Sequence, residues 1–267
     1  SYSSKKFNSI LNNNPVNSLA GFGSAKGSNE EAYLFQKLIR TGFKTNNVDH
    51  CTRLCHASSV AALLQSVGSA AVTAPFTAAK DAECIIVIGA RPEQNHPVAA
   101  SYLKQAVKNG SKLIIIDPRK QNLSRYATHH LQFNPGQDLS LLNAMIYTII
   151  EEGLINKDYI KNNTEGFELL EKEIKGFDPL LMEKLCGIKA EVIKEVARLY
   201  AKSKTSIIFW GMGISQHVHG TQNAFCLINL ALITGQVGRD GTGLHPLRGQ
   251  NNVQGASDAG LIPMSYP

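Results

Sequence analysis

The chain has 267 residues, of which 43% are hydrophobic and 18% are charged, as in an ordinary globular protein with a sizeable buried core. Its net charge of +6 comes without a basic run of five residues, which excludes a nucleic-acid-binding tail but suits a polyanionic ligand such as a nucleotide diphosphate. No apolar run is long enough to span a bilayer, so membrane insertion is not expected.

The cysteine content indicates a reducing compartment. An odd count without paired spacing argues against a disulfide framework, and we therefore expect a cytoplasmic protein. The chain starts with a serine and stops without a helix end, so we expect both ends to be cuts in a longer protein, and a periplasmic location stays open. The cysteines are Cys51, Cys55, Cys84, Cys186 and Cys226.

The first part of the chain predicts a polar segment and then a helix. Residues 1–17 are Asn-rich, which is typical of a linker. Ser28 and Glu31 have the spacing of a capping box and predict a helix over residues 29–40. The buried face of this helix is expected to hold Tyr33, Leu34 and Leu38.

The middle of the chain alternates between buried strands and helices. Buried strands are expected over residues 83–89, 112–117 and 206–211, and a short strand that runs into a loop is expected earlier, over residues 18–24. Helices are expected over residues 97–109, 138–153, 190–202 and 221–234. This alternation predicts an α/β fold with a doubly wound, mostly parallel sheet. Right-handed crossovers then bring the carboxyl end of every strand to one edge.

Loops at that edge bind ligands in such folds. The loops over residues 89–96, 117–120 and 211–216 carry glycines, amides, carboxylates and arginines, a set suited to a nucleotide. They contain neither a Gly-x-Gly-x-x-Gly fingerprint after a strand nor a Walker A lysine. Spacing alone therefore predicts only a nucleotide-binding α/β domain. The alternative is that Asp117 and Ser215 merely cap the turns that follow them.

The densest cluster of reactive side chains runs from His50 to His56 and includes Cys51 and Cys55. All four could form a zinc site, although adjacent residues converge poorly on one tetrahedral ion. One thiolate could instead bind a softer metal while a neighbouring histidine moves protons. The cysteines could also be small buried hydrophobic residues. The spacing leaves these interpretations open.

A second unusual segment runs over residues 246–256. Arg248 stands between a leucine and a glycine, in a stretch too irregular for a helix, and its planar N–H pair would suit a small carboxylate. Several amides follow it, beginning at Gln250. The alternative is a polar surface loop in which glycines and amides form turns.

Both segments resemble one branch of a known family. Residues 46–60 closely resemble the metal-ligand segment of the formate dehydrogenase branch of the molybdopterin oxidoreductases, and residues 248–255 resemble that branch's substrate loop. The similarity runs in unbroken order from about Leu19 to Pro267. Further matches lie at residues 29–37, 117–119, 141–145 and 210–213.

The resemblance implies a specific centre. Cys55 would be the protein ligand to a molybdenum or tungsten ion, His56 the active-site histidine beside it, and Arg248 the residue that orients formate. The metal would be held by two molybdopterin guanine dinucleotides (bis-MGD). The residues implied in cofactor binding are Gly89, Asn95, Asp117, Arg119, Gly136, Asp138, Gly211, Gly213, Gln216 and Gln250.

The implied reaction oxidises formate to CO₂, with His56 moving the proton and the electrons leaving through an iron–sulfur relay to an electron-transfer subunit or domain. The family's four-cysteine motif is absent from this chain, so the 4Fe-4S cluster is expected upstream and none is expected here. The family's C-terminal capping domain is also expected outside these residues. We therefore expect this chain to be inactive alone.

For the domains, we expect a dinucleotide-type molybdopterin-binding domain over residues 51–250. Residues 1–50 and 251–267 would be pieces of a second, discontinuous α/β domain. Two alternatives remain for the function. One is a nitrate-reductase-like enzyme of the same family, which a histidine at position 56 argues against. The other is a folded scaffold without cofactor.

Overall fold

The computed structural model describes residues 1–267, apart from the side chain of Val16. The chain forms two compact units. Residues 58–247 make up one of them, called the sheet unit here. Residues 1–57 and 248–267 together make up the other, called the discontinuous unit.

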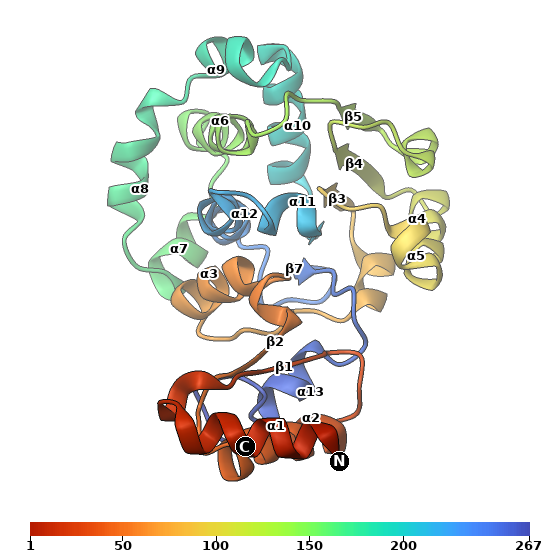
Figure 1. Cartoon of the computed structure of the whole chain (residues 1–267). Helices are drawn as coiled ribbons and strands as arrows, with labels where there is room; N and C mark the ends of the chain where they lie inside the picture. Colours follow the sequence, from red (N-terminus) through yellow and green to blue (C-terminus); the bar gives the residue numbers. More distant parts are fainter. The chain divides into compact units, whose positions relative to one another are not determined.

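In the described part of the sheet unit, a five-stranded parallel sheet has the order β5-β4-β3-β6-β7. The strands are β3 (Cys84–Ile88), β4 (Lys112–Ile116), β5 (His129–Leu131), β6 (Ser206–Trp210) and β7 (Gly243–Pro246). The register places Ile86 opposite Ile114 on one side and Ile208 on the other. The chain starts in the middle of the sheet and winds outward in both directions, which confirms the doubly wound fold (Figure 1).

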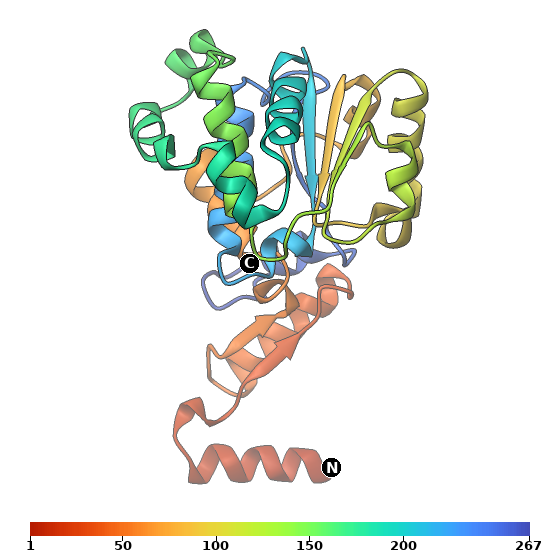
Figure 2. The same ribbon diagram turned by 90° about the horizontal axis from the view of Figure 1, so that it is seen from above.

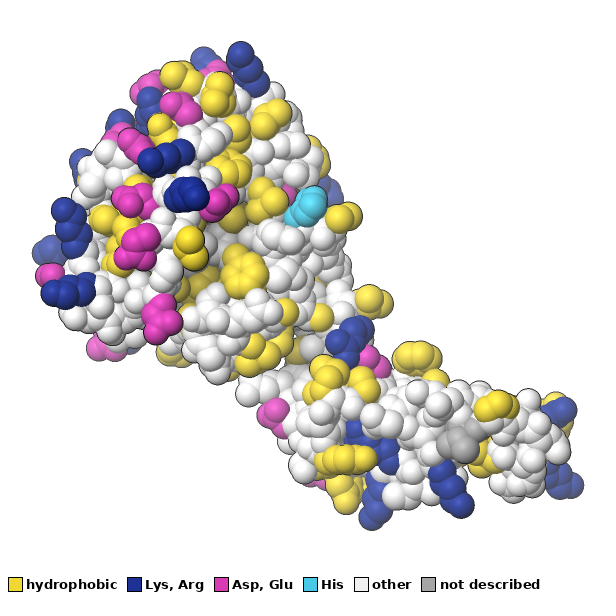
Figure 3. All heavy atoms as spheres, turned by 90° about the vertical axis from the view of Figure 1, so that its left-hand side faces the viewer, with side chains coloured by type: hydrophobic (Ala, Val, Ile, Leu, Met, Phe, Trp, Pro, Cys, Tyr) yellow, Lys and Arg dark blue, Asp and Glu magenta, His cyan; other side chains and the backbone are white. Residues whose placement is uncertain are grey.

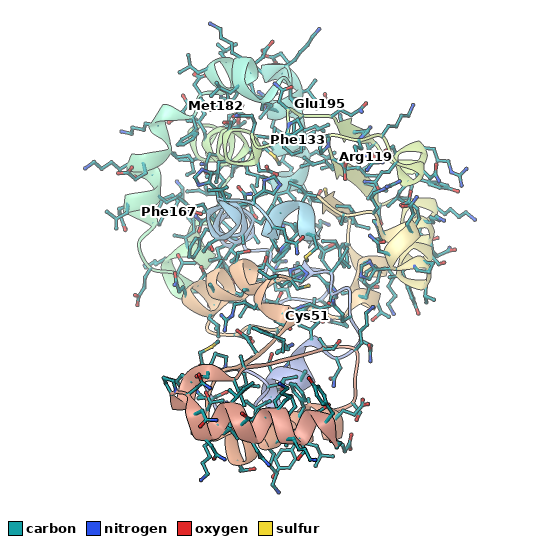
Figure 4. The ribbon with its side chains drawn as sticks, viewed as in Figure 1. Cys51, Arg119, Phe133, Phe167, Met182 and Glu195 are labelled. Carbon is teal, nitrogen blue, oxygen red and sulfur yellow. The ribbon has the colours of Figure 1, made fainter. Side chains whose placement is uncertain are left out.

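Helices cover both faces of this sheet, as Figure 2 shows with the strands seen nearly edge-on. Alternate residues of each strand enter different cores, because successive side chains point to opposite faces. Ile86 and Ile88 belong to the larger core, with Phe133 and Met182, which Figure 4 labels. Ile85 belongs to the smaller core on the other face.

The helices of the sheet unit precede β3 or lie between the strands, and α6 to α10 follow one another between β5 and β6. They are α3 (Ala57–Val67, whose first residue precedes the unit), α4 (Pro92–Asn95), α5 (Pro97–Lys108), α6 (Asp138–Glu151), α7 (Lys157–Asn163), α8 (Phe167–Glu173), α9 (Pro179–Cys186), α10 (Ala190–Lys202), α11 (Met212–Ser215) and α12 (Gly220–Ile233). Shorter 3-10 helices span Phe76–Asp81, Asn122–Tyr126 and Ile174–Gly176. The expected helices form as α5, α6, α10 and α12, each within two residues of its expected bounds.

The discontinuous unit joins the two ends of the chain. It contains α1 (Tyr2–Asn13), a 3-10 helix (Val16–Ser18), β1 (Gly21–Gly23), α2 (Asn29–Lys37), a π-helical turn (Leu38–Gly42), β2 (Val48–His50), a 3-10 helix (Cys51–Arg53) and α13 (Val253–Asp258). Strands β1 and β2 pair in parallel. The Arg40 guanidinium donates to the carbonyl oxygens of Gly260 (2.6 Å) and Ile262 (2.7 Å), which ties the last residues to α2.

Two expectations for this unit are wrong. Residues 2–13 form α1 rather than a linker, because the Ser1 side chain accepts a hydrogen bond from the Ser4 amide and caps the helix. Helix α2 has the expected capping box but buries a different face. Its buried residues, with the following turn, are Ala32, Gln36 and Ile39, whereas Tyr33, Leu34 and Leu38 are 40%, 62% and 51% exposed.

The reason for the different face of α2 lies in its neighbour β1. Ile39 packs so closely on Gly21 that a Cβ atom there would lie 2.5 Å from Ile39 Cδ1. Ala32, Gln36 and Ile39 have the i, i+4, i+7 spacing of one helix face. Because Gly21 leaves room for Ile39, this face is the one that packs on the strand.

The structure bears on two features raised by the sequence, the possibility of a membrane-spanning segment and the distribution of the net positive charge. Within the described residues, no helix has the length and apolar character that crossing a membrane requires. On the face of the sheet unit drawn in Figure 3, basic and acidic side chains are interspersed. The net positive charge is therefore not concentrated on this face.

Candidate functional site

Cys55 lies in the turn between β2 and α3. Its amide donates to the carbonyl oxygens of Cys51 and Thr52, both at 3.1 Å, so the chain makes one tight turn between the two cysteines. Cys55 is 9% exposed, and the following His56 is fully buried. Figure 4 labels Cys51 at the start of this turn.

A segment from the far end of the chain meets this turn within the discontinuous unit. The Cys55 thiol donates to Gln250 Oε1, with a sulfur–oxygen distance of 3.6 Å. Ala25 lies against both segments, since its amide donates to Cys51 Sγ (3.3 Å) and its carbonyl accepts from the Asn252 amide (2.9 Å). The structure thus brings the two unusual sequence segments together.

The electrostatics couple Cys55 to Arg248. Burial raises the pKa of the Cys55 thiol, and the positive charge of Arg248 acts in the opposite direction. Burial also lowers the pKa of the Arg248 guanidinium, an effect that the Cys55 sulfur opposes. Each group therefore stabilises the charged form of the other, which partly offsets the effect of burial on both.

This arrangement has a defined chemical capacity. A single thiolate is a good ligand for a soft transition metal, and a half-buried guanidinium can hold a small carboxylate by two parallel hydrogen bonds. Among the residues that the structure describes, no three His, Cys, Asp or Glu side chains gather as a metal-binding group. The His50 ring contacts Ser257 and Thr52 rather than the Cys55 thiol.

In the sheet unit, the loops after four strands begin side by side at the carboxyl edge. The backbone hydrogen bonds between neighbouring strands continue for one residue beyond the strand ends. The amides of Gly89, Asp117 and Gly211 donate to the carbonyl oxygens of Ile116 (3.0 Å), Leu131 (3.1 Å) and Ile88 (3.2 Å), respectively. The candidate cofactor residues follow these strands in order. Gly89 and Asn95 follow β3, Asp117 and Arg119 follow β4, Gly136 and Asp138 follow β5, and Gly211, Gly213 and Gln216 follow β6.

Two of these loops touch through their glycines. Gly89 has a φ of +56°, and the Gly213 amide donates to its carbonyl oxygen at 3.0 Å. A Cβ atom at Gly213 would lie 2.6 Å from Gly89 Cα. Only glycine allows the two backbones to approach this closely.

The loop after β6 is also anchored to α3. Trp210 Nε1 donates to Ser59 Oγ at 2.8 Å, and Ser59 Oγ lies 2.6 Å from Ser215 Oγ. Ser58 Oγ donates to the Ser215 carbonyl at 2.6 Å. These bonds hold the end of β6 and the end of α11 against α3.

Two buried carboxylates lie at this edge. Asp117 Oδ1 accepts from the Arg119 amide at 2.8 Å, which is the turn-capping bond that the alternative interpretation expects. Asp138, 3% exposed, stands at the first position of α6. Burial raises its pKa, and the nearby His217 lowers it.

Sequence reasoning missed three further polar groups at the same edge. Arg91 Nε, Glu93 Oε2 and Gln121 Oε1 are buried and lack a hydrogen-bond partner among the described residues. The other side-chain atoms of Glu93 and Gln121 are engaged, because Glu93 Oε1 accepts from the Leu123 amide (2.7 Å) and Gln121 Nε2 donates to the Ala90 carbonyl (3.0 Å). Arg91 and Glu93 lie inside the loop over residues 89–96, which the sequence singled out. Gln121 lies one residue after the second such loop, over residues 117–120.

Known proteins resemble this chain along most of its length. The profile of a family described as molybdopterin oxidoreductase matches residues 2–265. The chain is 44% identical over 246 residues to the "F420-dependent formate dehydrogenase subunit alpha" of Methanocaldococcus jannaschii, covering 92% of this chain and 37% of that protein. It is 42% identical over 246 residues to "Formate dehydrogenase H" of Escherichia coli, covering 92% and 34%.

The chain thus spans about a third of the length of these relatives. Among solved structures, acetylene hydratase from Pelobacter acetylenicus superimposes with a TM-score of 0.75 and 23% sequence identity, over 91% of this chain and 33% of that one. This likeness confirms the fold.

Proposed function

Because the chain belongs to the molybdopterin oxidoreductase family, we propose that the protein oxidises formate to CO₂ at a molybdenum or tungsten bis-MGD centre. One observation carries the proposal. Cys55, Gln250 and Arg248 converge in the discontinuous unit, with the thiol 3.6 Å from the Gln250 amide oxygen and coupled electrostatically to the guanidinium. Several relatives named as formate dehydrogenases support the choice of substrate.

The donor groups present fit the proposed centre. Cys55 offers one soft sulfur ligand. At the carboxyl edge of the sheet unit, Arg91, Glu93 and Gln121 offer unpaired polar atoms to a bound nucleotide. When bound, the metal and its pterins supply the two-electron oxidation, while the protein orients the reactants and tunes their charge.

Arg248 is proposed to bind formate. Its planar N–H pair matches the two oxygens of a carboxylate, which fixes the orientation of the single C–H bond. Partial burial strengthens this contact, because fewer water molecules compete for the guanidinium. Gln250, bonded to the Cys55 thiol, holds the segment after Arg248 close to that sulfur.

His56 is proposed to take up the proton that formate releases. It directly follows Cys55 in the sequence and its side chain is fully buried, which limits the freedom of its ring. An imidazole is suited to this step because its ordinary pKa lies near neutral pH.

The nucleotide part of the cofactor is proposed to lie along the carboxyl edge of the sheet unit. Asn95, Arg119 and Gln216 are exposed there, and Asp117 and Asp138 supply carboxylates at the same edge. Among the candidate glycines, Gly136 has open space where a Cβ atom would lie, which leaves room for a phosphate. Gly89, Gly211 and Gly213 instead allow the loops after β3 and β6 to lie against each other. We place the dinucleotide-binding domain accordingly, in the sheet unit.

Electrons are proposed to leave through a 4Fe-4S cluster outside these residues, to a partner subunit or domain. The test is to purify the natural-length protein, determine its molybdenum, tungsten and pterin nucleotide content, and assay formate-dependent dye reduction. We expect about one metal ion per protein, in line with a single cysteine ligand, and activity that requires it. The 267-residue chain is the control and should be inactive alone.

Other results would point elsewhere. Nitrate-dependent oxidation of reduced dye, without formate activity, would favour the nitrate-reductase-like alternative. A folded natural-length protein that contains neither metal nor pterin, even when expressed in a host that makes the cofactor, would favour a scaffold.

A further inference from the structure

The His50 side chain makes two hydrogen bonds inside the discontinuous unit. It is 3% exposed, at the end of β2. Its Nδ1 lies 3.1 Å from Thr52 Oγ1, and its Nε2 lies 2.9 Å from Ser257 Oγ. The proposed function uses none of these three side chains.

The direction of these bonds follows from the single proton of each hydroxyl group. Ser257 Oγ donates to the Val253 carbonyl at 3.1 Å within α13, so it accepts from His50 Nε2–H. The neutral ring then accepts at Nδ1 from the Thr52 hydroxyl. Burial lowers the pKa of His50, which favours the neutral ring that this pattern requires. The charged groups that face it, Asp49 and Arg53, act in opposite directions.

The two partners of His50 belong to the two segments of the candidate site. Thr52 lies in the turn that carries Cys55, and Ser257 lies in α13, directly after the segment that carries Arg248. The Cys55–Gln250 contact and the Ala25 backbone bonds join the same two segments. Those contacts reach Gln250 and Asn252, which precede α13 in the chain, whereas His50 bonds to Ser257 within α13.

We propose that His50 is a positioning residue that fixes the spacing between the Cys55 turn and the Arg248 segment through its bonds to Thr52 and Ser257. The consequence for formate binding rests on the proposed function, but the bridge itself does not. A shift of α13 would move Arg248 relative to the Cys55 sulfur, and small displacements of a substrate-orienting residue reduce turnover strongly.

A glutamine can replace part of this bridge. Its amide nitrogen reaches about as far from Cα as the Nε2 atom of histidine and can donate to Ser257. His50→Gln therefore keeps the bond to α13 and serves as the conservative variant. His50→Ala loses both bonds, and Ser257→Ala loses the one across to α13. Ser9→Ala, in the exposed helix α1, is the matched serine control.

The experiment measures hydrogen–deuterium exchange in the natural-length protein, purified without cofactor. Peptides covering residues 48–57 and 248–258 report on the two segments, and a peptide from β3 reports on the sheet unit. In His50→Ala, we expect both segments to exchange about tenfold faster, as for loss of two hydrogen bonds. The β3 peptide should be unchanged and Ser9→Ala should stay within about twofold of the wild type, whereas His50→Gln, which keeps the bond to Ser257, should accelerate exchange by no more than about threefold.

A second measurement uses the cofactor-loaded protein. At equal metal content, His50→Ala should raise KM for formate and lower kcat, and His50→Gln should restore both. Wild-type protein without formate activity would contradict the proposed function, while the exchange data would still decide the role of His50.

Three results would overturn the inference. The first is unchanged exchange in His50→Ala. The second is equal acceleration in the β3 peptide, which would mean that the substitution only destabilises the whole fold. The third is a His50→Gln variant that behaves like His50→Ala. If His50→Ala does not fold, Ser257→Ala provides the same comparison with one bond removed, and exchange equal to that of Ser9→Ala would overturn the inference.

Discussion

Replacing Gly213 with alanine should force apart two loops at the carboxyl edge of the sheet. The new Cβ atom would lie 2.6 Å from Gly89 Cα and 2.8 Å from Gly89 O. Carbon atoms in contact prefer a separation of about 3.5–4.0 Å, so one backbone must move by roughly 1 Å. Neither neighbour is a flexible side chain that could rotate away, and the Gly213–Gly89 hydrogen bond resists the movement.

Overpacking of this kind costs about 1–3 kcal/mol. The better helix propensity of alanine in α11 offsets a part of this, so we expect a net loss of about 1–2 kcal/mol. For a unit of this size, the loss lowers Tm by roughly 2–8 °C. Because the displaced loops are those proposed to hold the nucleotide, the pterin content should also fall.

The assay compares thermal unfolding and pterin content of Gly213→Ala with those of Gly176→Ala. The control position lies in the same unit, has no atom within 4 Å of the new Cβ and no positive φ. We expect Gly176→Ala to match the wild type in both measurements. If Gly213→Ala also unfolds at the wild-type temperature and keeps its full pterin content, the close approach of these loops has no role in cofactor binding.

Three further predictions concern single residues. Arg248→Lys keeps the charge but loses the planar pair of donors, so kcat/KM for formate should fall roughly 30- to 1000-fold, whereas a residue that only braces its loop would leave KM within about twofold and lower Tm instead. Asp117→Ala should lower cofactor content more than turnover per bound metal, and a full content would assign Asp117 to its turn-capping bond alone. Burial lowers the pKa of His50 and of His130. The unfolded chain therefore takes up protons first as pH falls below about 6.5, and the free energy of unfolding should decrease from pH 7 to pH 5.5. Denaturant titrations should show a smaller decrease in His50→Gln, and an equal decrease would remove His50 from this effect.

The central strands were predictable because each one is recognisable from its own residues, without knowledge of the strands that pair with it. Strands β3, β4 and β6 are almost continuous apolar runs, buried on both faces, and the structure gives each within a residue or two of its expected bounds. The edge strands β5 and β7 were missed. They span His129–Leu131 and Gly243–Pro246, and their short sequences contain histidine, glycine and proline rather than an apolar run.

The face of α2 was not predictable, for a different reason. Tyr33, Leu34 and Leu38 are more hydrophobic than Ala32 and Gln36, the two residues that α2 itself buries. The choice was made by a glycine in another element, because Gly21 accepts Ile39 at a distance that no other residue would permit. Helix amphipathicity identifies an apolar stripe, but the shape of the neighbouring surface determines which stripe is covered.

The same distinction applies to the candidate site. Cys55 and Arg248 were singled out by residue type and by resemblance, and each is recognisable within its own short segment. The contacts that join those segments are made by ordinary residues: an alanine backbone, a glutamine amide, and the histidine between Thr52 and Ser257. His50 and Gln250 were singled out in the sequence for other roles, but nothing marked them as contacts between these segments, because a hydrogen bond between distant segments leaves no periodicity in either one. The groups proposed to do the chemistry are therefore readable from the sequence, whereas the groups that set their spacing become visible only when both ends of the chain are folded into one unit.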